Sequence, residues 1–175
     1  MSRFSPKDKH FTHYLPDEHR NSLSYHNVHA LCMDGDDLWI GTYTGGVNVL
    51  NTKTGVFRVY TAKAGDPTTL DRSSSYAIFK DREARIWVTS MSGVNLYNRE
   101  EDNFTRIRDL GSWIMDIDQD ADGNIWFSSQ GNGLFKYDPD KQEWTNYVHS
   151  SAPGALINDQ VNCVSVSYTH LTLPT

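Results

Sequence analysis

The sequence predicts an all-β chain of four-stranded antiparallel blades, that is, a partial β-propeller. Three observations lead to this fold class. Aromatic residues make up 12% of the 175 residues. Short apolar runs alternate with Gly-containing turns, which is typical of many short strands. A unit of Trp, Gly and a closing aromatic residue recurs along the chain, and no helical period of 3.6 residues is visible.

The recurrent unit starts with a Trp that follows an apolar residue. A Gly then opens an alternating strand, and a large aromatic residue follows that Gly by eleven positions. The three copies consist of Trp39, Gly46 and Phe57, of Trp87, Gly93 and Phe104, and of Trp126, Gly133 and Trp144. Four strand signals within roughly 40 to 47 residues match a propeller blade. We expect each repeated Trp to lie on a second strand and to fill the space between adjacent blades.

Both ends of the chain fall inside the repeat. Phe4 and Phe11 are seven residues apart, as are Leu50 and Phe57, so the chain opens within a blade. The last nine residues have no Gly turn and no Trp strand, and they resemble translated adapter sequence. The predicted parts are the end of a preceding blade (1–14), three blades (15–61, 62–108 and 109–148), a linker with the first strand of a next blade (149–166), and a tail interpreted as non-native (167–175).

Composition excludes several functional classes. The net charge is −6, from 16 Lys and Arg against 22 Asp and Glu, and no run of basic residues is present. A nucleic-acid surface is therefore not expected, because phosphate contacts need clustered Lys and Arg. No apolar stretch is long enough for a membrane segment, and the first residues lack the apolar core of a signal peptide. The two cysteines, Cys32 and Cys163, have no metal-ligand spacing and are expected to be free thiols.

The order of the short motifs is similar to a known repeat. A Leu-Ser step precedes the inner strand, D-x-D-G-N-I-W covers 120–126, and F-x-x-Y closes the unit at 57–60. This order, from residue 3 to about 166, resembles the two-component-regulator propeller repeat. That repeat builds the periplasmic sensor region of hybrid two-component system histidine kinases of Bacteroidetes. The resemblance implies a periplasmic sensor, a homodimeric full-length parent, and kinase activity that belongs to the parent and not to this fragment.

Blade topology predicts the ligand-binding end. In an antiparallel blade the turns between the second and third strands share one end with the loops that connect successive blades. Aromatic rings with amide and hydroxyl groups suit a carbohydrate, because rings stack on C–H faces and polar groups select hydroxyls. We therefore expect an oligosaccharide or other small ligand. The candidate binding residues are Tyr25, Tyr43, Thr44, Arg72, Tyr76, Met91, Trp113, Gln130 and Asn132.

One acidic segment is similar to the first half of a calcium-binding loop. Asp118, Asp120 and Asp122 alternate before a Gly, as hard cations prefer. However, Ser129 occupies the position where such a loop needs a bidentate Glu, and the flanking segments look like strands. A hairpin turn in which Asp accepts local backbone N–H bonds is the better interpretation.

No other motif indicates catalysis. The sequence has no nucleophile elbow and no phosphate-binding loop, so no catalytic residue, cofactor or metal ligand is assigned. Four of the seven histidines, His10, His13, His26 and His29, are expected to be solvated, because no converging ligand set recurs. Two alternatives to the sensor hypothesis stay open. The chain could belong to a protein-interaction scaffold, or to a propeller lyase or hydrolase whose catalytic residues lie in missing blades.

Overall fold

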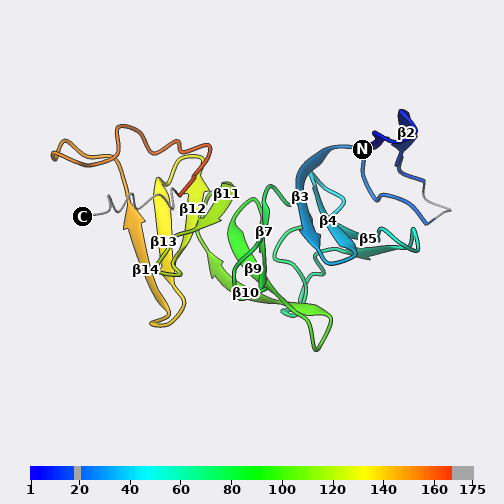
Figure 1. Ribbon diagram of the computed structural model, residues 1–175. Coiled ribbons are helices and arrows are strands. Elements are labelled where there is room, and N and C mark those ends of the chain that lie inside the picture. The colour runs from blue at the N-terminus through cyan, green and yellow to red at the C-terminus, as the bar shows by residue number, and fades with distance from the viewer. Residues whose placement is uncertain (18–20, 167–175) are drawn as a thin grey trace, which may run out of the picture. The chain divides into compact units, whose positions relative to one another are not determined.

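The computed structural model describes residues 1–17 and 21–166, and these residues form fourteen β-strands and no helix (Figure 1). Twelve of the strands make three sheets, each with four strands in chain order and antiparallel to their neighbours. Such a sheet is a propeller blade. The predicted fold class is therefore confirmed. The tail predicted to be non-native, 167–175, lies outside the described residues.

The three blades consist of consecutive strands. Blade 1 contains β3 (Val28–Asp34), β4 (Asp37–Thr42), β5 (Val47–Asn51) and β6 (Phe57–Tyr60). Blade 2 contains β7 (Ile78–Lys80), β8 (Ile86–Thr89), β9 (Gly93–Asn98) and β10 (Asn103–Asp109). Blade 3 contains β11 (Ile114–Gln119), β12 (Ile125–Ser129), β13 (Leu134–Asp138) and β14 (Glu143–Tyr147).

A two-stranded sheet precedes blade 1, formed by β1 (Ser2–Ser5) and β2 (His10–His13). Phe4 pairs with Phe11 in the same register in which Leu50 pairs with Phe57. The strands β1 and β2 thus hold the positions of a third and a fourth strand. Residues 149–166 contain isolated bridges but no strand of a sheet, so the first strand of a next blade stays a prediction, as do the domain boundaries.

The described residues form two compact units, which divide between Ile114 and Met115. In the first unit, hydrophobic side chains cover both faces of blade 1, because alternate residues of a strand point to opposite faces. Trp39 and Val49 pack toward blade 2, against Ile78 and Phe104. Ile40, one residue after Trp39, belongs to a second cluster on the side of Tyr14.

The repeated Trp of blade 1 fills the predicted space between two blades. Trp39 is 1% exposed, stacks in parallel with Tyr60 of its own blade, and meets Tyr97 of blade 2 edge-on at a ring-centroid distance of 4.6 Å. Trp87 is equally buried. In the second unit Trp126 is half-buried and stacks on Tyr147 at 5.6 Å.

The indole N–H groups of the three tryptophans differ. Trp87 and Trp126 donate to the carboxylates of Asp81 and Asp120, in both cases at 2.7 Å. The indole N–H of Trp39 is buried and has no hydrogen-bond partner in the part of the chain that the structure describes. The turn before Trp39 is one residue shorter, so no Asp stands six positions before it.

The repeated Gly lets the fourth strand approach the third. Gly46 has φ +76 and Gly133 has φ +77, and a Cβ at either position would collide with the backbone carbonyl of Tyr60 or Tyr147. A side chain is unfavourable there for two reasons, steric contact and the left-handed backbone. A Cβ at Gly93 would lie 2.7 Å from the carbonyl oxygen of Arg108.

A buried Asn on the third strand fixes the loop that enters blades 1 and 2, and we call this contact the Asn clamp. Asn48 accepts the backbone N–H of Ser24 at 2.8 Å and donates to its hydroxyl at 2.7 Å. Asn95 accepts the N–H of Asp71 at 3.0 Å and donates to its carboxylate at 2.6 Å. Blade 3 has Phe135 at the same distance after its Gly, and so lacks the clamp.

The second unit has its own packing. Phe127 is fully buried and stacks on Trp144. Beyond blade 3, the backbone N–H groups of Val164 and Val166 donate to the carboxylates of Asp116 and Asp118 on β11. Side chains, and not a main-chain ladder, therefore hold residues 164–166 beside this strand.

Candidate ligand-binding site

An aromatic cluster forms at the predicted ligand-binding end of the first unit. Tyr43 lies in the turn between β4 and β5, Tyr76 lies two residues before β7, and Trp113 directly precedes β11. Tyr76 and Trp113 stack with ring centroids 5.5 Å apart and planes at 20°. Tyr43 stands at 84° to Tyr76, at 6.5 Å. Two ring directions, nearly perpendicular to each other, therefore meet at this end.

His29 completes the aromatic cluster because of a β-bulge. The pairing of β3 with β4 shifts between Val28 and Ala30, and the intervening His29 is left outside the ladder. A bulge redirects the side chain of the extra residue. The His29 ring lies 4.9 Å from Tyr76 and 6.0 Å from Tyr43. His29 is exposed, as expected of a solvated histidine, but its contact with two candidate residues was not predicted.

The cluster combines exposed rings with a buried polar atom. Tyr43 is 37% exposed and Trp113 is 38% exposed, whereas Tyr76 is only 8% exposed. The Tyr76 hydroxyl is buried and has no hydrogen-bond partner among the described residues. A buried hydroxyl without a partner is unfavourable unless water or a ligand satisfies it. Burial raises the pKa of Tyr76, and the neighbouring Tyr43 adds to the rise, so the hydroxyl stays protonated at neutral pH.

The remaining candidate residues do not join this cluster. Tyr25 stacks on His26 at 4.4 Å in the loop before β3. Thr44 and Met91 lie in turns between second and third strands, at the predicted end of their blades. Gln130 and Asn132 occupy the corresponding turn of blade 3, which belongs to the second unit. Ligand contact by each candidate residue stays a prediction.

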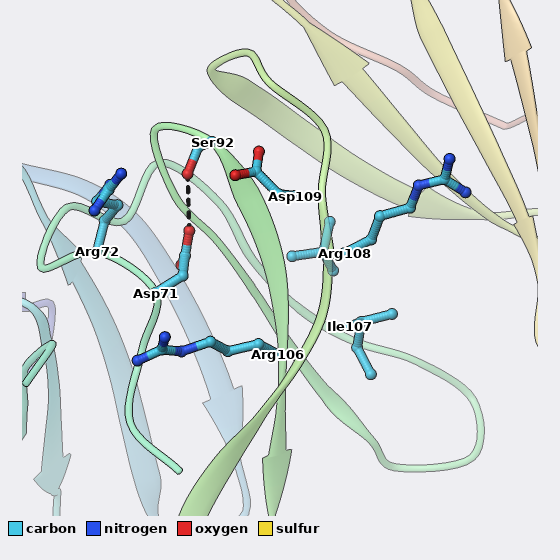
Figure 2. A pocket seen from close by; sticks show the side chains of 8 residues that line it. Asp71, Arg72, Ser92, Arg106, Ile107, Arg108 and Asp109 are labelled. Carbon is cyan, nitrogen blue, oxygen red and sulfur yellow. Dashed lines mark hydrogen bonds between the residues drawn. The ribbon is translucent and has the colours of Figure 1, made fainter. Parts of the chain in front are cut away.

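Arg72 lines a pocket of about 400 Å³ in the first unit (Figure 2). The pocket lies between the loop that enters β7, the turn between β8 and β9, and the end of β10. Its walls are formed by Asp71, Arg72, Ser92, Val94, Arg106, Ile107, Arg108 and Asp109. A hydrogen bond of 3.0 Å joins the Ser92 hydroxyl to the Asp71 carboxylate. Sequence reasoning named Arg72 but not the pocket around it.

The acidic segment of blade 3 is a hairpin turn, as interpreted from the sequence. The Asp120 carboxylate accepts the backbone N–H groups of Asp122 and Asn124 and the indole N–H of Trp126. Burial alone would raise the pKa of Asp120, but these hydrogen bonds outweigh it and hold the pKa below its usual range. In the described ranges, no three His, Cys, Asp or Glu side chains gather as a metal site.

Fold and repeat together define the class of this protein as a partial β-propeller. Residues 22–44 match the family model described as two component regulator propeller, which confirms the resemblance seen in the repeats. No curated protein sequence matches the chain. The described residues contain no helix that could cross a membrane.

Three solved structures show the same fold. An extracellular domain from Bacteroides thetaiotaomicron, described as part of a hybrid two-component system, is 21% identical, with a TM-score of 0.71 over 92% of this chain and 20% of that one. A second extracellular domain from that organism, described as part of a one-component system, is 17% identical, with a TM-score of 0.80 over 97% and 22%. The chain thus spans about one fifth of each domain. A catalytically inactive virginiamycin B lyase from Staphylococcus aureus is 18% identical, with a TM-score of 0.63 over 86% and 48%.

Proposed function

We propose that this chain is part of the extracytoplasmic propeller with which a hybrid two-component regulator senses a saccharide. The aromatic cluster of Tyr43, Tyr76 and Trp113 carries the proposal. It lies at the end of the blades where turns and connecting loops meet, and its outer rings are open to solvent. The matched repeat and the likeness to extracellular sensor domains support the extracytoplasmic, periplasmic setting.

The cluster offers the two kinds of contact that a sugar ring uses. Trp113 is 38% exposed while its ring stacks on Tyr76, so part of the indole surface stays accessible to a ligand. The C–H groups of a pyranose pack on such a face, and this excludes water from apolar surface. Tyr43 stands nearly perpendicular to the neighbouring Tyr76 ring and forms a second wall of the cluster. The Tyr76 hydroxyl, which lacks a partner among the described residues, would pair with a ligand hydroxyl or with a water that the ligand orders.

Sensing follows if the ligand binds one arrangement of the parent better than another. A ligand shifts an equilibrium only by its differential affinity for the two states. In the homodimeric parent, a saccharide on this end of the propeller would favour one arrangement of the two protomers. The propeller fragment itself would bind without turnover.

Binding is tested by calorimetry with a panel of oligosaccharides, namely cellotriose, xylotriose, mannotriose, arabinotriose and trigalacturonic acid. We expect saturable binding of at least one member, and Trp113→Ala weakens that binding by about tenfold or more, because it removes the stacking face. Tyr147→Ala is the matched control. Tyr147 is also an aromatic residue of similar exposure, 41%, but it stacks on Trp126 in the second unit.

The same experiment separates the alternatives. If no sugar binds, or if Trp113→Ala binds as the unchanged chain does, the saccharide site is wrong. Binding of a peptide at the cluster in place of every sugar would favour the interaction scaffold. New reducing ends or unsaturated products during incubation would favour a lyase or hydrolase, for which His29 beside Tyr76 would be the first residue to replace.

A further inference from the structure

The pocket beside Arg72 adjoins the aromatic cluster through two loops. Arg72 is four residues before Tyr76 in one loop, and Asp109 is four residues before Trp113 in the other. Four extended residues span at most about 14 Å. The loop 109–113 is anchored to the pocket wall, because the carbonyl oxygen of Ser92 accepts the backbone N–H groups of Leu110 and Gly111. A ligand of a few sugar rings can therefore reach from the cluster into the pocket.

A β-bulge sets the directions of the arginines on β10. The pairing with β9 shifts between Arg106 and Arg108, which leaves Ile107 outside the ladder. In a regular strand Arg106 and Arg108 would share one face, but because of the bulge they point to opposite faces. In Figure 2, Arg106 extends toward the side of Asp71, whereas Arg108 extends away from it.

Two of the ionic side chains in the pocket already have most of their hydrogen bonds. The Arg106 guanidinium donates to the backbone carbonyls of Asp66, Thr69 and Leu70, so it forms a fixed positive wall. The Asp71 carboxylate accepts from Ser90, Ser92 and Asn95. Asp71 is thus held by neutral donors and does not need a cation from a ligand.

Arg72 differs from these residues. Its side chain is exposed at the pocket, and it has no hydrogen bond or ion pair within residues 1–17 and 21–166. Asp109 uses one carboxylate oxygen to accept the backbone N–H of Gly111 at 2.8 Å. Arg72 therefore keeps its guanidinium donors available at the pocket, whereas backbone carbonyls already use those of Arg106.

We propose that this pocket is a second subsite, which binds the carboxylate or sulfate group of an acidic saccharide through the Arg72 guanidinium. The proposal rests on the proposed function, since a neighbouring ring of the same ligand would lie on Trp113. A guanidinium suits this role because its planar donors match the two oxygens of a carboxylate or sulfate. The volume of about 400 Å³ admits one sugar unit.

The test compares ligands that differ only in charge. Binding of trigalacturonic acid and of its methyl ester is measured by calorimetry on the whole chain. We expect the acid to bind about tenfold more tightly than the ester, and this preference falls with added salt. Arg72→Ala removes the preference and leaves binding of the ester unchanged. Arg3→Ala, which removes an exposed arginine of β1, is the matched control and keeps the preference. A chondroitin sulfate disaccharide and its desulfated form distinguish sulfate from carboxylate.

Failure of the subsite and failure of the proposed function give different results. If Trp113→Ala abolishes binding of both ligands and Arg72→Ala changes nothing, the sugar site stands and the subsite is refuted. If Arg72→Ala weakens binding of the acid but Trp113→Ala does not, the subsite stands without the aromatic platform.

NMR titration with sodium sulfate gives a readout without any sugar. The backbone amides of Ser92 and Gly93 should shift in the unchanged chain but not in Arg72→Ala, and equal shifts in both would overturn the assignment.

Discussion

Removal of the Asp81 carboxylate should be among the most destabilising single changes in the first unit. The Asp81 side chain is 0% exposed, and it accepts the indole N–H of Trp87 at 2.7 Å. It also accepts the backbone N–H of Arg85 at 2.8 Å and the Nε–H of the same residue at 2.6 Å. Asp81→Ala leaves the buried indole donor unpaired. It also leaves the backbone N–H of Arg85 without this partner, and each unpaired buried donor costs about 1–3 kcal/mol. The Arg85 side chain is 32% exposed and keeps its ion pair with Glu83, so its charge adds little to the loss. We expect a loss of about 3–5 kcal/mol.

Trp39 provides the matched control for the hydrogen bond itself. Trp39 and Trp87 are each 1% exposed, and both belong to the first unit. Trp→Phe removes the same volume at both positions, but only Trp87 loses a hydrogen bond, since the Trp39 N–H has no partner among the described residues. Trp87→Phe should therefore cost about 1.5–3 kcal/mol more than Trp39→Phe, the value of a bond to a charged group.

Urea unfolding followed by circular dichroism measures these free energies, provided that the slope with urea stays the same among the variants. The double variant Asp81→Ala/Trp87→Phe should lose less than the sum of the single losses, because the two side chains share one bond. Equal destabilisation by Trp39→Phe and Trp87→Phe, together with additive losses in the double variant, would refute the reasoning.

Three further predictions concern the residues that hold the blades together. Gly46→Ala should destabilise the chain by about 3 kcal/mol, because the added Cβ would collide with the carbonyl of Tyr60. Gly55 has a similar φ but open space around it, so Gly55→Ala is the control and should cost about 1 kcal/mol in the same urea assay. Asn95→Leu breaks the Asn clamp and should cost about 2–4 kcal/mol, and a loss under about 1 kcal/mol would contradict the clamp. The Tyr60 hydroxyl donates to Asp102 and holds the pKa of that carboxyl below its usual range. The stabilisation of the folded state by the ionised Asp102 is therefore fully present above about pH 4 and is lost as the pH falls further. Tyr60→Phe should raise this pKa, measured by carboxyl NMR, and an unchanged pKa would refute the assignment.

The blades could be predicted because each one repeats the same local packing. Phe4 and Phe11 pair in the register of Leu50 and Phe57, so a fixed spacing in sequence becomes a fixed pairing in the sheet. The two buried asparagines could also have been found, because a Gly-Val-Asn triplet opens the third strand of both blades that have the Asn clamp.

The candidate site was predictable only in part. The end of the blades follows from antiparallel topology, which placed Tyr43, Tyr76 and Trp113 correctly at one end. Their stacking could not be predicted, because the loops before β7 and β11 differ in length and sequence and their paths depend on tertiary contacts. The bulge at His29 has no Gly or Pro to mark it in the sequence, and it decides which way the His29 ring points.

The Asn clamp explains how blades with the same backbone can present different side chains to a ligand. In blade 1 the residue after the clamped Ser24 is Tyr25, and in blade 2 the residue after the clamped Asp71 is Arg72. Because the clamp fixes the backbone at the preceding residue, the next side chain can change from aromatic to cationic without loss of the blade. Substitution of Arg72 should therefore alter ligand preference at nearly constant stability, whereas substitution of Asp71, which also accepts two serine hydroxyls, should alter both.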